Sequence, residues 1–413
     1  MKDLFIRNRE KLNAHLNDGD LVLLYQGSAP KSTADAHYTF KPNKNFFYFT
    51  GLNQENFILA IQKLNNKLST TLFIEFPNYE VEKWHGRKLK KETATEISGI
   101  ETVLYTQEYE SWLTKNFYGD KIKKVYFDLE KLDWNEADSY NHKQALDIQK
   151  RFPFAPIGTI HPVALKLRMF KEAEEIAQMQ KAVDITKKGL EDVMTFMKPG
   201  AMEYQLESTF AHSIRMNGAD GNSFPTIAAG GSEAVILHYV ENNRPLEENT
   251  LVLIDLGAQY KEYAADITRT YPVSGKFSAR QKEIYRIVLK AEQAVIAMMK
   301  PGVPFAELNE TCKKVLSEEL MHIKLIASAE ELSKYYYHGV SHHLGLDVHD
   351  LGDRETVLAE GMVFTVEPGL YIAEENIGIR IEDDVLITAT GHRVLSADII
   401  RTTDEIEAFM AKR

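Results

Sequence analysis

Two stretches decide the fold, TLVLIDLGAQYKEYAADITRTY (250–271) and MVFTVEPGLYIAEENIGIRIEDDVLI (362–387). Each contains an apolar run rich in strand-forming residues, a polar turn and a second apolar run, which predicts a hairpin. We place the first turn near Tyr260-Lys261 and the second near Glu374-Glu375. Both hairpins carry acidic residues inside apolar runs, where an ionised carboxylate is costly unless it is compensated.

The acids of each hairpin are predicted to face one another. With the turns centred as above, Asp255 lies opposite Asp266, and Glu367 lies opposite Glu382. Directly opposed residues have Cβ atoms about 4.5–5.5 Å apart, and like charges at that distance destabilise the pair. A single Asp in a strand, or the EDD run at 382–384, is by itself typical of a solvated surface. The prediction of a buried site therefore depends on the joint pattern.

An internal duplication relates the two hairpins. MKPGAMEYQL (197–206) is echoed by MKPGVPFAEL (299–308). Further along, LEENTLVLIDLG (246–257) aligns without a gap with LAEGMVFTVEPG (358–369). The order of the two echoes is the same, so we expect two related units packed about a pseudo-two-fold axis, with a site on that axis.

The duplication brings equivalent chemistry to the axis. It aligns Asp255 with Glu367, and each copy has a histidine after its Pro-Gly, His238 in the first and His342 in the second. Four carboxylates converging in an apolar surrounding would be neutralised by two divalent cations. Such a pair about 3.5–4 Å apart would lower the pKa of a shared water to near 7 and give a hydroxide nucleophile beside a Lewis acid.

Imidazole ligands are available in YYYHGVSHHLGLDVHD (335–350), which carries His338, His342, His343 and His349. An oxygen-rich site with a single imidazole suits Mn²⁺, with Co²⁺ or Zn²⁺ as less favoured occupants. The sequence thus predicts a dinuclear metal centre in the second half of the chain.

The part of the chain before residue 160 alternates strand-like apolar runs with charged, helix-compatible segments. The expected strands are LVLLY (21–25), FFYFTG (46–51), FILAI (57–61), TLFIEF (71–76) and KVYFDL (124–129). The Pro-marked segment 151–163 suits a domain edge. Residues 166–197 predict one long amphipathic helix that ends at Pro199-Gly200. We therefore expect two domains, 1–165 and 166–413.

Composition restricts the class of protein. A chain of 413 residues suits two domains. Its net charge of −11 argues against a nucleic-acid-binding surface and against docking on anionic lipid. The single cysteine, Cys312, cannot form an internal disulfide, and we expect neither a secretory signal nor a membrane-spanning segment, because the chain starts with frequent charges and has no apolar run of 18 residues. We expect a cytoplasmic protein that binds neither nucleic acid nor membrane.

Motifs of the second half resemble those of the Xaa-Pro aminopeptidases (aminopeptidase P), a family of pita-bread metallopeptidases. The matching segments are ILHY (236–239), IDLGAQYKEYAADITRTYPVSG (254–275), HGVSHHLGLDVHD (338–350), TVEPGLYI (365–372) and GIRIEDDVLIT (378–388). FFYFTGLNQENFILAI (46–61) and EKWHGRKL (82–89) are similar to the N-terminal domain of that family. The resemblance implies an α/β (α+β) protein with an N-terminal mixed α/β domain and a C-terminal pita-bread domain that contains a pseudo-two-fold repeat.

The resemblance also implies the metal ligands. They are Asp255, Asp266, His342, Glu367 and Glu382. Asp266 and Glu382 would bridge both metals, Asp255 would complete one, and His342 with Glu367 would complete the other. Glu367 would additionally shuttle a proton from the water to the leaving nitrogen.

Further roles are implied for residues around the metals. His238 and His349 match residues that contact the substrate and stabilise the tetrahedral intermediate. His338, Tyr371 and Arg380 match residues that line or support the proline pocket. Trp84 matches an aromatic residue that a neighbouring subunit supplies, so we expect a homo-oligomer, dimer or tetramer. The N-terminal domain would restrict access and contribute to assembly.

The implied substrates are peptides with proline in second position, cut before the proline. An X-Pro link has no N–H and a fixed φ, so a site that holds the ring does not need the missing donor. One alternative is prolidase, which cuts Xaa-Pro dipeptides with the same ligands; GLYI after Glu367-Pro368 favours the aminopeptidase. The other is a non-catalytic binding module of the same fold, which the intact ligand set disfavours.

Overall fold

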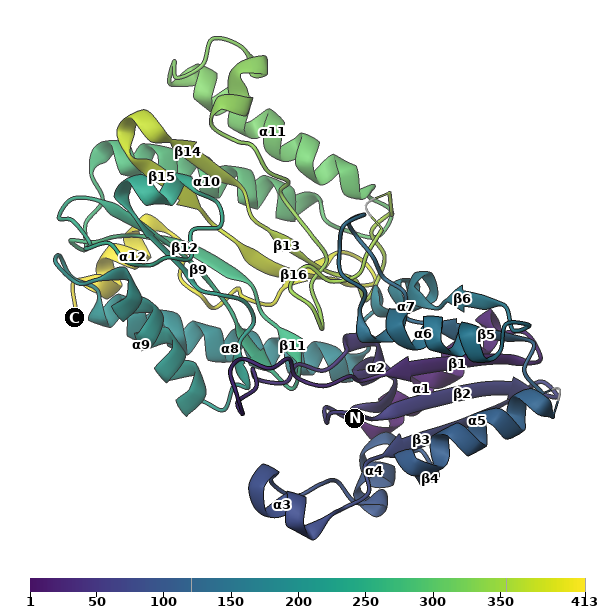
Figure 1. The fold of residues 1–413 in the computed structure, drawn as a ribbon. Coiled ribbons are helices and arrows are strands. Elements are labelled where there is room, and N and C mark those ends of the chain that lie inside the picture. Colours follow the sequence, from purple (N-terminus) through teal and green to yellow (C-terminus); the bar gives the residue numbers. More distant parts are fainter. Residues whose placement is uncertain (120, 354, 413) are drawn as a thin grey trace. The chain divides into compact units, whose positions relative to one another are not determined.

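The computed structural model describes residues 1–119, 121–353 and 355–412. The chain divides into two compact units, Met1–Arg168 and Met169–Arg413 (Figure 1). The Pro-marked segment 151–163 belongs to the first unit, where it contributes an edge strand and the start of a helix. Within the described residues, every helix is too short or too polar to cross a lipid bilayer.

The first unit is a mixed sheet flanked by helices. Its helices are α1 (Lys2–Lys11), η1 (Leu12–His15), α2 (Lys44–Thr50), α3 (Tyr79–His85), α4 (Lys91–Ser98), η2 (Thr106–Glu108), α5 (Tyr109–Tyr118), α6 (Tyr140–Arg151) and α7 (His161–Arg168). Its strands are β1 (Asp20–Tyr25), β2 (Ile58–Leu64), β3 (Lys67–Ile74), β4 (Thr102–Tyr105), β5 (Lys124–Phe127) and β6 (Ile157–Thr159). They follow the order β4-β3-β2-β1-β5-β6. The pairs β1–β2 and β2–β3 are antiparallel, and the others are parallel.

Burial on both faces explains the apolar runs of this sheet. Leu21, Leu23 and Tyr25 of β1 pack with residues of α5 and α6 in one hydrophobic cluster. The intervening Val22 and Leu24 are also buried. Four expected strands are confirmed as β1, β2, β3 and β5. Continuous apolar runs of this kind are typical of a sheet covered on both faces.

The prediction of a strand at 46–51 is wrong, because this segment forms α2. The Asn43 side chain accepts a hydrogen bond from the backbone N–H of Phe46 at 2.8 Å and so caps the helix start. Gly51 ends the helix in the left-handed region with φ 69°, a common conformation for a residue that follows a helix. Every residue from Asn45 to Thr50 is buried, so the sequence shows no amphipathic period that would have indicated a helix.

Gly51 provides a stability test of this helix end. A Cβ at Gly51 would lie 2.1 Å from Cε2 of Phe5, and its φ is left-handed. Gly51→Ala should therefore lower the free energy of unfolding by about 3 kcal/mol, from backbone strain plus overpacking. Gly86, with φ 83° and nothing within 4 Å, is the matched control, and Gly86→Ala should cost only about 1 kcal/mol. Denaturant unfolding measures both, and equal losses would contradict the clash.

The second unit is built from paired helices and small antiparallel sheets. Its helices are α8 (Ala173–Phe196), α9 (Glu203–Met216), η3 (Gly231–Val235), α10 (Ala279–Met298), α11 (Phe305–His322), η4 (Ala329–Lys334), η5 (Ala373–Glu375) and α12 (Thr403–Met410). Its strands are β7 (Gly221–Asn222), β8 (Ile227–Gly230), β9 (Leu251–Leu256), β10 (Ala258–Tyr260), β11 (Tyr263–Ala264), β12 (Ile267–Pro272), β13 (Val363–Val366), β14 (Gly369–Ile372), β15 (Ile377–Arg380), β16 (Asp383–Ile387) and β17 (His392–Val394).

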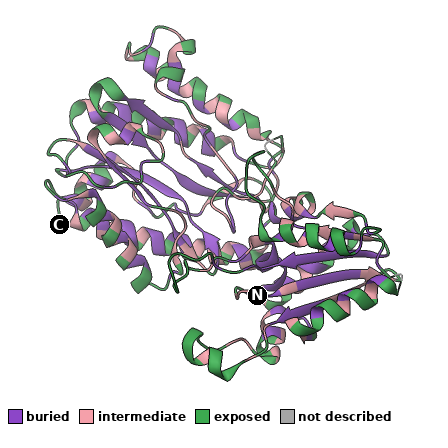
Figure 2. Ribbon diagram, in the orientation of Figure 1, coloured by how far each residue is buried: buried purple, intermediate pink, exposed green. Residues whose placement is uncertain are grey.

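The strands of this unit form a buried layer. In Figure 1, β9, β12, β13 and β16 run between the helix pair α8–α9 and the helix pair α10–α11. The sheets have the orders β12-β9-β8, β13-β16-β17, β14-β15 and β11-β10-β7. Figure 2 shows this layer buried, and every residue of β9, β12, β13 and β16 is buried. An acid in these strands therefore has little access to water.

The single helix expected over 166–197 is interrupted near its start. α7 ends at Arg168 in the first unit, and α8 begins at Ala173. The start of α8 is a capping box, in which the backbone N–H of Glu172 donates to Oε2 of Glu175 at 2.9 Å. The helix ends before Pro199-Gly200, as the sequence predicts.

The internal duplication is confirmed by repeated backbone geometry. Gly200 joins α8 to α9 with φ 80°, and Gly302 joins α10 to α11 with φ 94°. The backbone N–H of Gly200 donates to the carbonyl of Leu246 at 2.8 Å, and that of Gly302 donates to the carbonyl of Leu358 at 2.9 Å. Each copy therefore docks its helix–helix turn on the segment that precedes the first strand of its hairpin, β9 in the first copy and β13 in the second.

The register of the first hairpin differs from the prediction. The turn is Lys261-Glu262, with φ 47° and φ 70°, and a two-residue hairpin turn of this type requires positive φ at both positions. This register places Asp255 opposite Thr268 and leaves Asp266 just before β12. The prediction that Asp255 lies directly opposite Asp266 is therefore wrong, by two residues. An even shift keeps a side chain on the same face, so both acids still face the same side.

The register of the second hairpin is confirmed. Gly369 pairs with Arg380 in β14–β15, and Val366 pairs with Asp383 in β13–β16. Glu367 and Glu382 lie between these two ladders in the same register, where the strands of both sheets break.

Candidate metal centre

Residues from both hairpins meet at one point. The backbone N–H of Glu382 donates to the carbonyl of Thr268 at 3.0 Å, which ties the second hairpin to the first. The expected ligands lie at strand ends around this contact: Asp255 in β9, Asp266 before β12, Glu367 between β13 and β14, Glu382 between β15 and β16, and His342 in the loop before β13.

Four of the expected ligands converge. The ligand atoms of Asp266, His342 and Glu382 all lie within 4.8 Å of one another. Nε2 of His342 is 3.4 Å from Oδ2 of Asp266 and 3.6 Å from Oε1 of Glu367. Nδ1–H of His342 donates to the carbonyl of His343 at 2.9 Å. With Nδ1 used in this way, Nε2 faces the carboxylates, an arrangement that suits a cation between them.

Asp255 joins the cluster through an arginine. Arg380 donates from Nη2 to Oδ2 of Asp255 at 2.6 Å. Oδ1 of Asp255 is buried and has no hydrogen-bond partner among the described residues. One oxygen of Asp255 is thus neutralised within the protein, and the other remains available to a cation.

The positive groups of the protein do not balance the negative charge of these buried carboxylates. Burial, followed by the charges of Asp266, Glu367 and Asp255, raises the pKa of Glu382 well above its usual value. Burial and then Asp255 raise the pKa of Asp266 well above its usual value. A cation among these oxygens would reverse both effects. Carboxylate oxygens with one imidazole nitrogen fit divalent ions of the Mn²⁺, Co²⁺ and Zn²⁺ group.

His338 is a neutral hydrogen-bonded ring beside the cluster. Burial and then the charge of Arg380 lower the pKa of His338 to about 4. Its Nδ1–H donates to the carbonyl of Gly339 at 2.7 Å, so its Nε2 accepts from the hydroxyl of Tyr371 at 2.8 Å.

Arg380 connects this ring to the acids. Its Nη1 donates to the hydroxyl of Tyr371 at 3.0 Å, and its Nε donates to Oγ1 of Thr268 at 3.1 Å. The hydroxyl of Thr268 in turn donates to Oε2 of Glu382 at 2.6 Å. A continuous hydrogen-bond chain therefore fixes His338, Tyr371 and Arg380 relative to Glu382.

The remaining predicted residues are not part of this series of hydrogen bonds. His349 is exposed, and its ring lies 4.4 Å from that of His342 at 73°. His238 is exposed in the segment after η3, and its charge contributes to the lowered pKa of His338. Trp84 lies on α3 of the first unit with 84% of its surface exposed. His343, the remaining histidine of the segment 335–350, is buried and packs on Phe364.

Comparison with known proteins identifies the family. The model of metallopeptidase family M24 matches residues 177–389, and the model of the aminopeptidase P N-terminal domain matches residues 5–126. The chain belongs to metallopeptidase family M24. The pita-bread fold class predicted from the motifs is confirmed.

Full-length relatives give the branch of this family. The chain is 34% identical over 429 residues to the Xaa-Pro aminopeptidase of Escherichia coli (strain K12), with 98% of this chain and 97% of the relative covered. The solved structure of a proposed aminopeptidase P from Bacillus anthracis has a TM-score of 0.98 at 45% identity and covers 100% of this chain and 98% of that one. Aminopeptidase P from E. coli with the inhibitor Pro-Leu has a TM-score of 0.91 at 33% identity, with 100% and 98% covered. The resemblance to Xaa-Pro aminopeptidases is confirmed, and this M24 chain is a metallo-exopeptidase of that type.

Sequence reasoning missed a fully buried arginine behind the metallopeptidase site. Nη1 of Arg269 donates to the carbonyls of Thr268 at 3.0 Å and Glu382 at 2.6 Å, and its Nη2 donates to Oδ1 of Asp383 at 2.7 Å. Asp383 and Asp384 are completely buried, so the EDD run is not solvated. The available signal was Arg269 itself, a charge inside the strand-forming segment ITRTYP (267–272).

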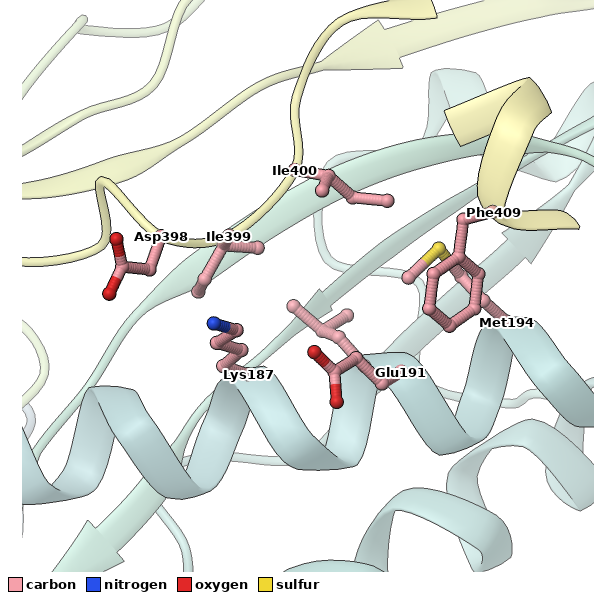
Figure 3. A pocket seen from close by; sticks show the side chains of 8 residues that line it. Lys187, Glu191, Met194, Asp398, Ile399, Ile400 and Phe409 are labelled. Carbon is pink, nitrogen blue, oxygen red and sulfur yellow. The ribbon is translucent and has the colours of Figure 1, made fainter. Parts of the chain in front are cut away.

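A separate small pocket of the second unit has different chemistry. It lies between α8 and the segment that leads into α12, and it is lined by residues that include Lys187, Glu191, Met194 and Phe409 (Figure 3). None of the predicted site residues lines this pocket. The carboxylate cluster is therefore the candidate site of the metallopeptidase.

The raised pKa values predict a pH effect on the metal-free protein. Asp266 and Glu382 remain protonated in the folded chain at pH values where they ionise in the unfolded chain. Unfolding then releases protons, so the free energy of unfolding falls as pH rises from about 4 towards the raised folded values. Denaturant unfolding in a chelator should show this fall between about pH 5 and 8.

Asp266→Asn provides the comparison for this pH effect. It removes one of the two titrating acids, so the pH slope of the metal-free variant should be smaller. A saturating divalent metal should flatten the slope of the unsubstituted protein. A slope that neither the variant nor the metal changes would contradict this assignment.

Proposed function

We propose that this metallo-exopeptidase hydrolyses the bond between an N-terminal residue and a proline in second position, with two divalent cations held by Asp255, Asp266, His342, Glu367 and Glu382. The main support is the convergence of Asp266, His342 and Glu382 from both copies of the repeat within 4.8 Å. Further support comes from the Xaa-Pro aminopeptidase of E. coli, which matches the chain over nearly its full length.

We assign the cations as Mn²⁺, because oxygen-rich sites with one imidazole favour that ion, with Co²⁺ or Zn²⁺ as alternatives. Such cations, when bound, polarise a carbonyl and lower the pKa of a water molecule to near neutrality. Asp266 and Glu382 would supply oxygens to both ions. Oδ1 of Asp255, which is buried without a partner among the described residues, would supply one.

Glu367 is assigned as the group that moves a proton. Burial is the largest influence on its pKa, which lies above the usual value. A carboxylate of raised pKa accepts a proton readily and can deliver it near neutral pH. We assign to Glu367 the transfer of a proton to the proline nitrogen as the peptide bond breaks.

The imidazoles bind and orient the peptide. His238 and His349 are exposed, and we assign them to contact the substrate, with His238 donating to the oxygen of the scissile carbonyl. His338, Tyr371 and Arg380 form the surface for the proline ring. Their mutual hydrogen bonds fix that surface before substrate arrives.

We assign to the first unit a role in forming the oligomer and in restricting access of substrates to the metal site. Trp84 exposes 84% of its surface on α3, and we propose that in a homo-oligomer, dimer or tetramer, it reaches the site of a neighbouring subunit. We also propose a catalytic domain at 166–413, an N-terminal domain at 1–165, and a cytoplasmic location, in keeping with the single buried cysteine, Cys312.

A comparison of peptide lengths tests this function. Protein loaded with Mn²⁺ should release the first residue from an Xaa-Pro-Xaa tripeptide much faster than it cleaves the matching Xaa-Pro dipeptide. Metal analysis should give two ions per chain, and chelation should abolish turnover. Faster cleavage of the dipeptide would identify a prolidase, and metal binding without cleavage of either peptide would indicate a binding module.

A substitution at His238 tests its role as a carbonyl donor. His238→Ala should lower kcat by about 10²–10³, the usual cost of one lost oxyanion donor, and should leave the metal content unchanged. Asp266→Ala is the contrasting variant, since it removes a proposed bridging ligand and should lose both metals. Loss of metal from His238→Ala, or full metal content and substantial activity in Asp266→Ala, would contradict these roles.

A further inference from the structure

The segment that carries His238 is fixed by a buried carboxylate from another element. Glu203, the first residue of α9, is completely buried. Its Oε1 accepts from the backbone N–H of Gly230 at 2.8 Å. Its Oε2 accepts from the hydroxyl of Tyr239 at 2.8 Å and from the backbone N–H of Arg244 at 2.9 Å. The side chain of Glu203 therefore connects the end of β8 at Gly230 to two points of the segment that follows it, Tyr239 and Arg244.

Tyr239 transmits this constraint to its neighbour. In residues 236–240, the side chains alternate: Tyr239 is buried, whereas Ile236, His238 and Val240 are exposed. Burial and then the hydrogen bond to Glu203 raise the pKa of Tyr239 to about 12, so its hydroxyl keeps its proton and donates at neutral pH. The hydrogen bond of Tyr239 to Glu203 restrains the backbone at Tyr239, and His238, whose side chain is exposed, is the residue directly before it in the chain.

The segment is anchored at both of its ends as well. The hydroxyl of Tyr337, next to His338 in sequence, donates to the carbonyl of Val235 at 2.6 Å. The side chain of Asn242 accepts from the backbone N–H of Ala228 at 3.0 Å. Glu203 lies between these anchors and holds the part of the segment that carries His238.

The internal repeat indicates that the first position of the second helix, Glu203 in the first copy, does not need a carboxylate for packing. Glu203 and Phe305 are equivalent, since each begins the second helix after a Pro-Gly turn. The backbone N–H of Glu203 donates to the carbonyl of Arg244 at 3.0 Å, and that of Phe305 donates to the carbonyl of Thr356 at 3.0 Å. The second copy thus has an apolar ring where the first copy has an acid. Only the first copy carries His238.

We propose that Glu203 is a positioning residue for the reaction, which holds Tyr239 and thereby aims His238 at the scissile carbonyl. This inference rests on the donor role of His238 in the proposed function. A carboxylate with three donors is a stronger clamp than a neutral side chain, because charge-assisted hydrogen bonds are shorter and stronger. Glu203→Gln replaces one acceptor oxygen by an amide that cannot accept from a backbone N–H.

A double-mutant cycle on Mn²⁺-loaded protein with an Xaa-Pro-Xaa tripeptide tests the proposal. Glu203→Gln should lower kcat roughly 10- to 100-fold, as expected for a misplaced catalytic group, with KM and metal content unchanged. Tyr239→Phe should act in the same direction with a smaller loss. In a His238→Ala background, neither substitution should lower kcat further, because the group being aimed is absent.

Asp192→Asn is the matched control. Asp192 of α8 accepts from the hydroxyl of Ser213 of α9 at 2.6 Å, so its substitution loosens α9 without touching residues 230–244. Its kcat should stay at the wild-type value. If Glu203→Gln does not fold, Tyr239→Phe completes the cycle.

Two results would overturn the positioning role. One is an equal loss of kcat from these substitutions with and without His238, which is the signature of general damage. The other is wild-type kcat in both Glu203→Gln and Tyr239→Phe. A His238→Ala variant with wild-type kcat is a separate outcome: it removes the donor role in the proposed function, and the positioning role with it.

Discussion

The structure depends on the crowding of carboxylates where two hairpins meet. The hydrogen bond from the backbone of Glu382 to Thr268 brings the two copies of the repeat into direct contact, and that contact forces their acids together. An uncompensated buried ion costs several kcal/mol. The protein compensates on two sides, with Arg380 on Asp255 and Arg269 on Asp383. Between the two arginines, Asp266, Glu367 and Glu382 lie close to His342, and a divalent cation held there would complete the charge balance.

The two copies of the repeat share their backbone arrangement and their acidic positions, and they differ in the residues around the site. Both copies use the same Pro-Gly turn, with a left-handed glycine at Gly200 and Gly302, to join their helices. The same repeat places Asp255 and Glu367 at equivalent strand ends, so each copy contributes acids to one centre. At the start of the second helix, however, the copies differ, since Glu203 accepts hydrogen bonds and Phe305 packs against aromatic rings. Symmetry therefore accounts for the acids but not for the residues around them.

Sequence reasoning succeeded where a pattern had one physical cause. The repeat and the register of the second hairpin follow from alignment and turn position. The first hairpin failed because its turn uses Lys261 and Glu262 in left-handed conformations, with no glycine or asparagine to mark it. The helix at Lys44–Thr50 failed because burial on all sides removes the helical period. The buried state of Asp383 was not predictable, because its partner Arg269 is brought to it by contact between the hairpins. Local sequence carries no record of that contact.

The hydrogen bonds among His338, Tyr371 and Arg380 are compatible with a substrate group that has no N–H, such as the pyrrolidine ring of proline. His338 uses Nδ1–H on the carbonyl of Gly339, and its Nε2 accepts from Tyr371, which in turn accepts from Arg380. Because Nε2 of His338 already accepts a hydrogen bond within the protein, it is not free to accept one from a substrate N–H. An apolar pyrrolidine ring loses no hydrogen bond when it binds there, because proline has no N–H to satisfy. On the proposed assignment of His338, Tyr371 and Arg380 to the proline ring, the hydrogen bonds within this wall would favour proline in second position.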